Sequence, residues 1–112
     1  SDLNEKVKEE QYFVRGMQVA DEVVQHYSGV KFEAIHVLQL WFALFELALQ
    51  SHYPFKNAKA IAAAVDYMFH SALDLKATKK DAAAKYGVSV ATLTKYCDEL
   101  IEFVPNMLED EE

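Results

Sequence analysis

The sequence is poor in residues that break helices and in residues that build disulfide bonds or zinc sites. Its 112 residues include three glycines, two prolines and one cysteine, Cys97. A single cysteine excludes an intramolecular disulfide bond and a cysteine-based zinc site. No apolar run reaches the roughly 20 residues of a membrane-spanning helix, because polar and charged side chains interrupt the longest one, residues 34–49. We therefore expect a cytoplasmic protein with no membrane segment.

Basic residues are also scarce, and they are unevenly placed. The chain has 11 lysine and arginine residues against 18 aspartate and glutamate residues, a formal net charge of −7 at pH 7. Residues 56–96 nevertheless carry seven basic and three acidic side chains, whereas residues 1–55 carry four basic and eight acidic ones. The only locally positive segment is therefore 56–96, where phosphate groups would bind.

The motifs of catalysis and of metal or cofactor binding are missing from the sequence. It has no HExxH motif, no glycine-rich phosphate loop and no nucleophile elbow. The four histidines are dispersed, and Cys97 has no adjacent basic residue that would favour a thiolate. We therefore expect no enzyme, no metal site and no cofactor.

What the chain does contain is helical periodicity. Its length and its hydrophobic content of 52% predict one domain over residues 1–112. The helical periodicity predicts that this domain is all-α, with five helices separated by the glycines and prolines. We expect residues 34–49 to form a buried central helix and residues 57–73 to form an alanine-rich one that begins at the N-cap Asn57. The acidic end, residues 109–112, is typical of a frayed tail or of a junction with a further domain.

The first helix has an apolar face at three- and four-residue steps. This spacing predicts that one side of the helix packs on the core and that the polar residues between face solvent. The residues predicted to pack are Phe13, Met17, Ala20, Val24 and Tyr27.

Residues 78–104 have the signals of a helix-turn-helix. Thr78 is a predicted N-cap, Gly87 supplies the left-handed conformation that a tight helix exit needs, and Ser89 caps the next helix. Ala83 is small enough for a close crossing, and Leu93 is expected to be buried between the two helices.

These residues carry a family resemblance. The segment Ala83–Lys95, AAKYGVSVATLTK, resembles the helix-turn-helix of bacterial repressors. The longer segment Phe55–Val104, about half of the chain, resembles the second cyclin-like repeat of archaeal and eukaryotic transcription factor IIB, and the same module in small bacterial proteins of unassigned function. The matching features are Ala62–Tyr67, Thr78–Asp81 and Gly87–Val88. The resemblance implies a five-helix, cyclin-like bundle that serves transcription.

In such a module the second helix enters the major groove of DNA. Its exposed side chains here include no Arg, Asn or Gln for a bidentate base contact, so we expect weak sequence specificity. Asp98 and Glu99 follow on the same helix and would repel phosphate from any face they share with it. The candidate nucleic-acid-binding residues are Lys79, Lys80, Lys85, Ser89, Val90, Ala91, Thr94 and Lys95.

The alternative is a protein-interaction or dimerisation adaptor that uses a degenerate helix-turn-helix. The acidic total and the apolar residues Val90 and Ala91 at the start of the second helix favour a protein partner. The two hypotheses differ in salt dependence, because phosphate contacts weaken steeply as salt rises and apolar contacts do not. The sequence leaves the partner, double-stranded DNA or protein, and the oligomeric state open.

Overall fold

The computed structural model describes residues 2–27 and 31–104, with the backbone alone for residues 31 and 32. The predicted acidic end, residues 109–112, lies outside the described residues. All regular structure in the described part is helical, which confirms the prediction of five helices. They are α1 (Asp2–Gln25), α2 (Lys31–Gln50), α3 (Ala58–Ala72), α4 (Lys79–Tyr86) and α5 (Val90–Leu100).

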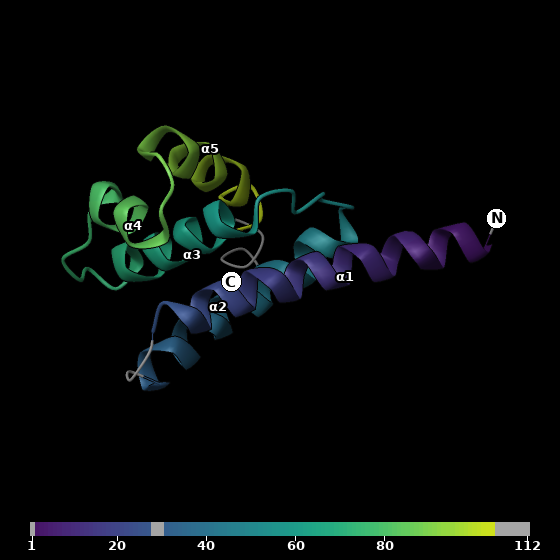
Figure 1. The fold of residues 1–112 in the computed structure, drawn as a ribbon, viewed down its shortest axis with the longest axis horizontal. Coiled ribbons are helices and arrows are strands. Elements are labelled where there is room, and N and C mark those ends of the chain that lie inside the picture. Colours follow the sequence, from purple (N-terminus) through teal and green to yellow (C-terminus); the bar gives the residue numbers. More distant parts are fainter. Residues whose placement is uncertain (1, 28–30, 105–112) are drawn as a thin grey trace, which may run out of the picture.

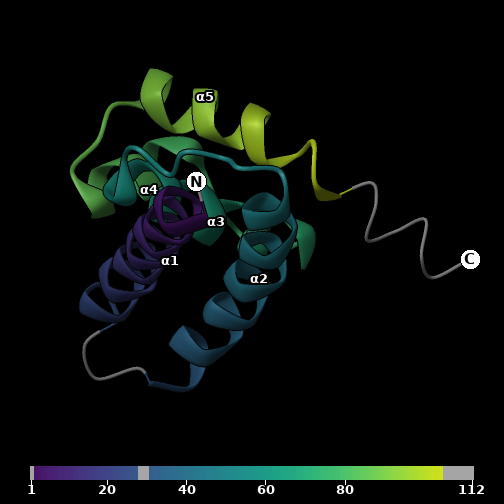
Figure 2. The ribbon, with the colours of Figure 1, turned by 90° about the vertical axis from the view of Figure 1, so that its right-hand side faces the viewer.

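The five helices are arranged around α3. The long helices α1 and α2 lie side by side as an antiparallel pair on one side of α3, and α4 and α5 pack on the other side (Figures 1 and 2). The first turns of α1 extend beyond the rest of the molecule (Figure 1). This layout places the helix-turn-helix on one side of α3 and the α1–α2 pair on the other.

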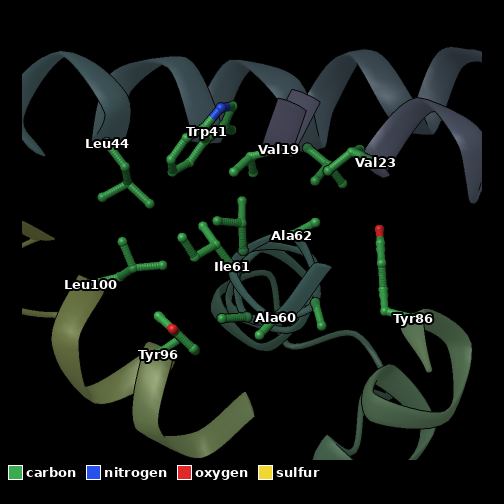
Figure 3. Close-up of a cluster of buried hydrophobic side chains, with 14 of the residues drawn as sticks. Val19, Val23, Trp41, Leu44, Ala60, Ile61, Ala62, Tyr86, Tyr96 and Leu100 are labelled. Atoms are coloured by element: carbon green, nitrogen blue, oxygen red, sulfur yellow. The ribbon is translucent and has the colours of Figure 1, made fainter. Parts of the chain in front are cut away.

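The central helix is α3, and the prediction that residues 34–49 form it was wrong. Every residue from Ala60 to Asp66 is buried, and side chains from the other helices surround α3 (Figure 3). By contrast, α2 exposes Ile35 and Phe42. Because alanine side chains are small, α3 lets neighbouring helices approach it from several directions, which the bulkier α2 does not.

The helix α2 was also the strongest candidate for a membrane segment. None of the described helices is both long enough and apolar enough to cross a membrane.

The side of α1 that packs on the core differs from the predicted one. Phe13, Met17 and Val24 are exposed, although Ala20 and Tyr27 are buried as predicted. The buried side is rotated around the helix axis. The residues that α1 buries are Gly16, Val19, Ala20 and Val23.

Gly16 explains this rotation. A β-carbon at Gly16 would overlap the ring of Phe45 on α2, and Trp41 Nε1 donates a hydrogen bond of 2.9 Å to the Gly16 carbonyl oxygen. Only a residue without a side chain lets the Phe45 ring lie directly against the backbone of α1. The face of α1 that contains Gly16 is therefore the face that packs on α2.

The segment between α2 and α3 closes the core with aromatic side chains. Phe55 is buried, and its ring packs edge-on against the rings of Trp41 and Phe45, with centroids 5.8 and 5.3 Å away. Arg15 Nη1 donates a hydrogen bond of 3.1 Å to the Pro54 carbonyl oxygen. These contacts hold the α2–α3 segment against α1, and α3 begins as predicted at Asn57, whose side chain accepts a hydrogen bond from the Ala60 amide.

Candidate nucleic-acid interface

The turn between α4 and α5 is built from three residues, Gly87 to Ser89. Gly87 has the left-handed conformation predicted for it, with φ 68° and ψ 36°. The Val88 amide donates to the Ala83 carbonyl (3.0 Å) and the Gly87 amide donates to the Ala84 carbonyl (3.3 Å). This pair of hydrogen bonds is the Schellman pattern that satisfies the last carbonyl groups of a helix. The direction in which α5 leaves α4 is thus fixed by backbone geometry.

Both helices of the segment begin at the predicted caps. Thr78 Oγ1 accepts a hydrogen bond from the Asp81 amide (3.0 Å), and Ser89 Oγ accepts one from the Thr92 amide (3.1 Å). Leu93 is fully buried and Ala83 nearly so, as expected for the positions that lock the two helices together. The local signals in the sequence therefore predicted this segment correctly.

The predicted binding residues on α5 fall into two groups. Val90, Ala91 and Lys95 are exposed, whereas Thr94 is partly buried. Ser89 is exposed, and its side chain is already engaged as a helix cap. The solvent-facing start of α5 therefore offers small apolar side chains and one cation.

The three predicted lysines of α4 have different surroundings. Lys80 is exposed. Lys79 is partly buried, with Nζ 6.0 Å from the centroid of the Tyr67 ring. Lys85 Nζ lies 3.0 Å from Asp66 Oδ2 and 3.7 Å from the centroid of the Tyr27 ring. A phosphate group would have to compete with Asp66 for Lys85, so Lys80 is the α4 lysine best placed to meet one.

Asp66 is the centre of a polar cluster that the sequence analysis missed. Its carboxylate is almost completely buried. It accepts hydrogen bonds from the hydroxyls of Tyr27 (2.8 Å) and Tyr86 (2.7 Å), and His70 Nδ1 lies 2.9 Å from Oδ1. Together with Lys85, these side chains join the end of α1, the middle of α3 and the end of α4. The cluster fastens the helix-turn-helix to the rest of the domain.

Burial and the carboxylate keep both tyrosines of this cluster in their hydroxyl form. Desolvation raises the pKa of Tyr27 and of Tyr86 well above the ordinary value, and hydrogen bonding and charge repulsion from Asp66 raise it further. Each hydroxyl therefore stays protonated at neutral pH and remains a donor to Asp66. The one sign of this cluster in the sequence is an acidic residue within an otherwise apolar stretch, residues 60–69, because a buried charge requires partners.

The two carboxylates of α5 that were expected to oppose phosphate binding face different ways. Asp98 is exposed. Glu99 accepts a hydrogen bond of 2.7 Å from the Tyr53 hydroxyl. Burial raises the pKa of Tyr53, and this hydrogen bond raises it further. Glu99 thus ties α5 to the α2–α3 segment, and Asp98 is the one of the two that presents negative charge to solvent.

An apolar groove runs between α3 and α5, with a volume of about 470 Å³. Leu40, Met68 and Ile101 contribute to its apolar lining, and its charged lining residues are Lys79 and Asp98. Ile101 is 50% exposed. The groove can accept apolar side chains from a partner.

Cys97 lies at the groove as an unreactive thiol. It is largely buried, and burial raises its pKa to about 11, so the thiol stays protonated at neutral pH.

Across residues 2–27 and 31–104, there is no group of three or more His, Cys, Asp or Glu side chains that could hold a metal ion.

Comparison with known proteins gives one partial match. Over 56 residues, half of this chain, the sequence is 45% identical to the TPR repeat-containing protein YvcD of Bacillus subtilis (strain 168). The match covers only 11% of that protein, so this chain corresponds to a small part of its relative. No family model matches the chain, and no solved structure matches it significantly.

Proposed function

We propose that residues 78–104 form a nucleic-acid-binding module that holds duplex DNA through its phosphates with little sequence specificity. The observation that carries the proposal is the left-handed turn at Gly87, after which the start of α5 is exposed within the locally positive segment 56–96. Exposed Lys80 and Lys95 are the cations best placed to meet phosphate. The resemblance to a cyclin-like repeat of transcription factor IIB supports a transcription-associated role. The single cysteine favours a cytoplasmic location, and the missing catalytic and cofactor-binding motifs favour a role without catalysis or a cofactor.

The composition of α5 supports weak base readout. The helix contains no Arg, Asn or Gln, the side chains that make most bidentate contacts with bases. Val90 and Ala91 are limited to apolar contact with a thymine methyl group, and exposed Asp98 repels the backbone. We therefore expect non-specific binding with a Kd of about 10⁻⁶ to 10⁻⁴ M at physiological salt.

A titration of a duplex of about 20 base pairs, repeated over a range of salt concentrations, tests this function. Lys80→Ala and Lys95→Ala should each weaken binding to every duplex and reduce the slope of log affinity against log salt by about one. Thr94→Ala should change only the preference among sequences. Lys8→Ala is the matched control, because Lys8 is an exposed lysine on α1 at the other end of the molecule. A parent protein without salt-sensitive binding at low ionic strength would refute the proposal.

A second candidate function is a protein-interaction adaptor. It is favoured by the apolar groove between α3 and α5, and by the similarity of half the chain to a protein that carries TPR repeats. A partner that inserts apolar side chains into the groove would bind with little salt dependence. Ile101→Asp should then abolish binding of that partner and leave DNA binding little changed, whereas Lys80→Ala should do the reverse.

A further inference from the structure

The α1–α2 pair carries apolar side chains on its solvent side, here called the outward face and defined as Val7, Phe13, Val14, Phe42 and Leu49. Phe13, Val14 and Leu49 line one shallow depression, and Val14 and Val7 line the next one along α1. Phe42 precedes Leu49 by two helical turns on the same side of α2. Phe13 is 53%, Val14 54% and Phe42 41% exposed.

The spacing of apolar residues on α1 is that of a helix with two packing sides. One side packs on α2 and α3 through Gly16 and its neighbours. A surface helix of a monomer needs only one such stripe. Three- and four-residue steps from residue 3 to residue 24 define seven positions on α1, of which five are exposed apolar residues and two are Glu10 and Asp21. These positions form a second stripe that offers another helix an apolar surface interrupted by two carboxylates. The apolar residues of this second stripe are Leu3, Val7, Val14, Met17 and Val24.

The position of α1 agrees with a helical partner. Its first turns extend beyond the other helices (Figure 1), and every residue from 2 to 11 is exposed. Leu3 and Val7 therefore stand on a stretch of helix whose side chains are all exposed to solvent. Short helices are marginally stable in water unless an apolar side is packed, so this stretch gains from a neighbour along its second stripe.

Charge selects the kind of neighbour. Glu9, Glu10 and Lys6 line the depression beside Phe13, and exposed Glu46 lies between Phe42 and Leu49 along α2. Arg15 lines the next depression, where its Nη1 donates a hydrogen bond to the Pro54 carbonyl oxygen. Over their described side chains, α1 and α2 carry eight carboxylates and three lysine or arginine residues. Two copies placed face to face would bring like charges together, whereas a helix flanked by basic residues would pair with them.

We infer that the outward face is a docking site for an amphipathic α-helix of a partner protein whose apolar stripe is flanked by lysine or arginine. The apolar stripe of the partner lies along the outward face, and its basic flanks pair with Glu9, Glu10 and Glu46. This site lies on the helices opposite the helix-turn-helix and is independent of DNA binding.

The probe for a test is a synthetic peptide of three heptads with leucine at positions a and d and lysine at e and g. Its matched control has glutamate at e and g. By isothermal titration calorimetry, the chain of residues 1–112 should bind the lysine peptide at least about tenfold more tightly than the glutamate peptide. Equal binding of the two peptides, or binding of neither, would overturn the proposal.

Variants of the protein locate the binding surface. Val14→Gln and Phe42→Gln should each weaken binding of the lysine peptide about tenfold. Both variants should fold, because both side chains are substantially exposed. Glu10→Gln should weaken binding less and reduce its salt dependence. Ile101→Gln is the control, since Ile101 is equally exposed but lies on the groove beside α5, and it should leave the affinity unchanged.

Three outcomes would contradict the inferred site. The first is that Val14→Gln and Phe42→Gln fold, as judged by circular dichroism, and yet bind the peptide as the parent does. The second is that Ile101→Gln weakens binding as much as they do. The third is that sedimentation reveals a dimer that Val14→Gln dissociates, in which case a second copy occupies the outward face.

Discussion

The crossing of α1 with α2 and the attachment of α4 to α3 both bring helices close together, but they do so by different chemistry. At the first crossing, Gly16 leaves room for the ring of Phe45, Trp41 donates a hydrogen bond to the Gly16 carbonyl, and the fit depends mainly on shape. At the second, buried Asp66 accepts hydrogen bonds from both neighbouring helices, and the fit depends on charge and donor geometry. The comparison teaches that the domain has two separate fastenings. The apolar fastening at Gly16 is disrupted when a larger side chain is introduced, and the polar fastening at Asp66 is disrupted when the carboxylate is removed.

The largest expected effect concerns the polar fastening. Asp66→Ala should lower the free energy of unfolding by about 3–5 kcal/mol, because two buried tyrosine hydroxyls and the Lys85 ammonium lose their acceptor. Urea unfolding measures the change, and Asp98→Ala, an exposed aspartate on α5, is the control with almost no expected loss. A loss under about 1 kcal/mol for Asp66→Ala would mean that the cluster does not fasten α4.

The next effect concerns the apolar contact inside the helix-turn-helix. Leu93 is fully buried, so Leu93→Ala should cost about 2–5 kcal/mol through lost burial and a residual cavity. Val90→Ala, three residues earlier on the exposed side, should change stability by less than about 0.5 kcal/mol. Equal stability of the two variants in thermal or urea unfolding would contradict the assignment of Leu93 as the residue that locks α5 onto α4.

A smaller effect tests the fit of shapes where α1 crosses α2. Gly16→Ala gains helix propensity but forces the buried Phe45 ring to move, so we expect a net loss of about 1 kcal/mol. Combining it with Phe45→Leu should recover at least about 0.5 kcal/mol relative to the sum of the two single losses, because the shorter side chain makes room. Additive losses in this double-mutant cycle would show that the two residues do not share the crossing.

The smallest effect concerns the second glycine. Gly87→Ala should also cost about 1 kcal/mol or less, but for a purely conformational reason, since a β-carbon at this position meets nothing within 4 Å. Gly87→Asn should cost less than the alanine variant, because asparagine tolerates the left-handed conformation better. A gain in stability with alanine would contradict the role of Gly87 in the turn.

The sequence predicted the helix-turn-helix well because its signals are local. Thr78, Gly87 and Ser89 each act on backbone groups within a few residues of themselves, so their positions alone determine where α4 and α5 begin and end. The burial of Leu93 follows from the same turn.

The packing of α1 and the identity of the central helix could not be predicted in the same way. The predicted packing side of α1 and the side that is buried share Ala20 and Tyr27, and only the distant Phe45 ring against Gly16 decides between them. Hydrophobicity favoured residues 34–49 as the centre, whereas small side chains put α3 there. The two tyrosine donors to Asp66 lie 20 and 39 residues away, and no local pattern connects them to it.

The single helix α1 spans nearly the whole range of local stability in this domain. Its first ten residues are exposed, whereas Val19 and Val23 are completely buried and Tyr27, just past its end, is bonded to Asp66. Amide hydrogen exchange should therefore slow steadily from the start of α1 to its end, while the amides of α3 exchange only when the whole domain unfolds. Proteases should likewise cut this one helix near its start long before they reach its end.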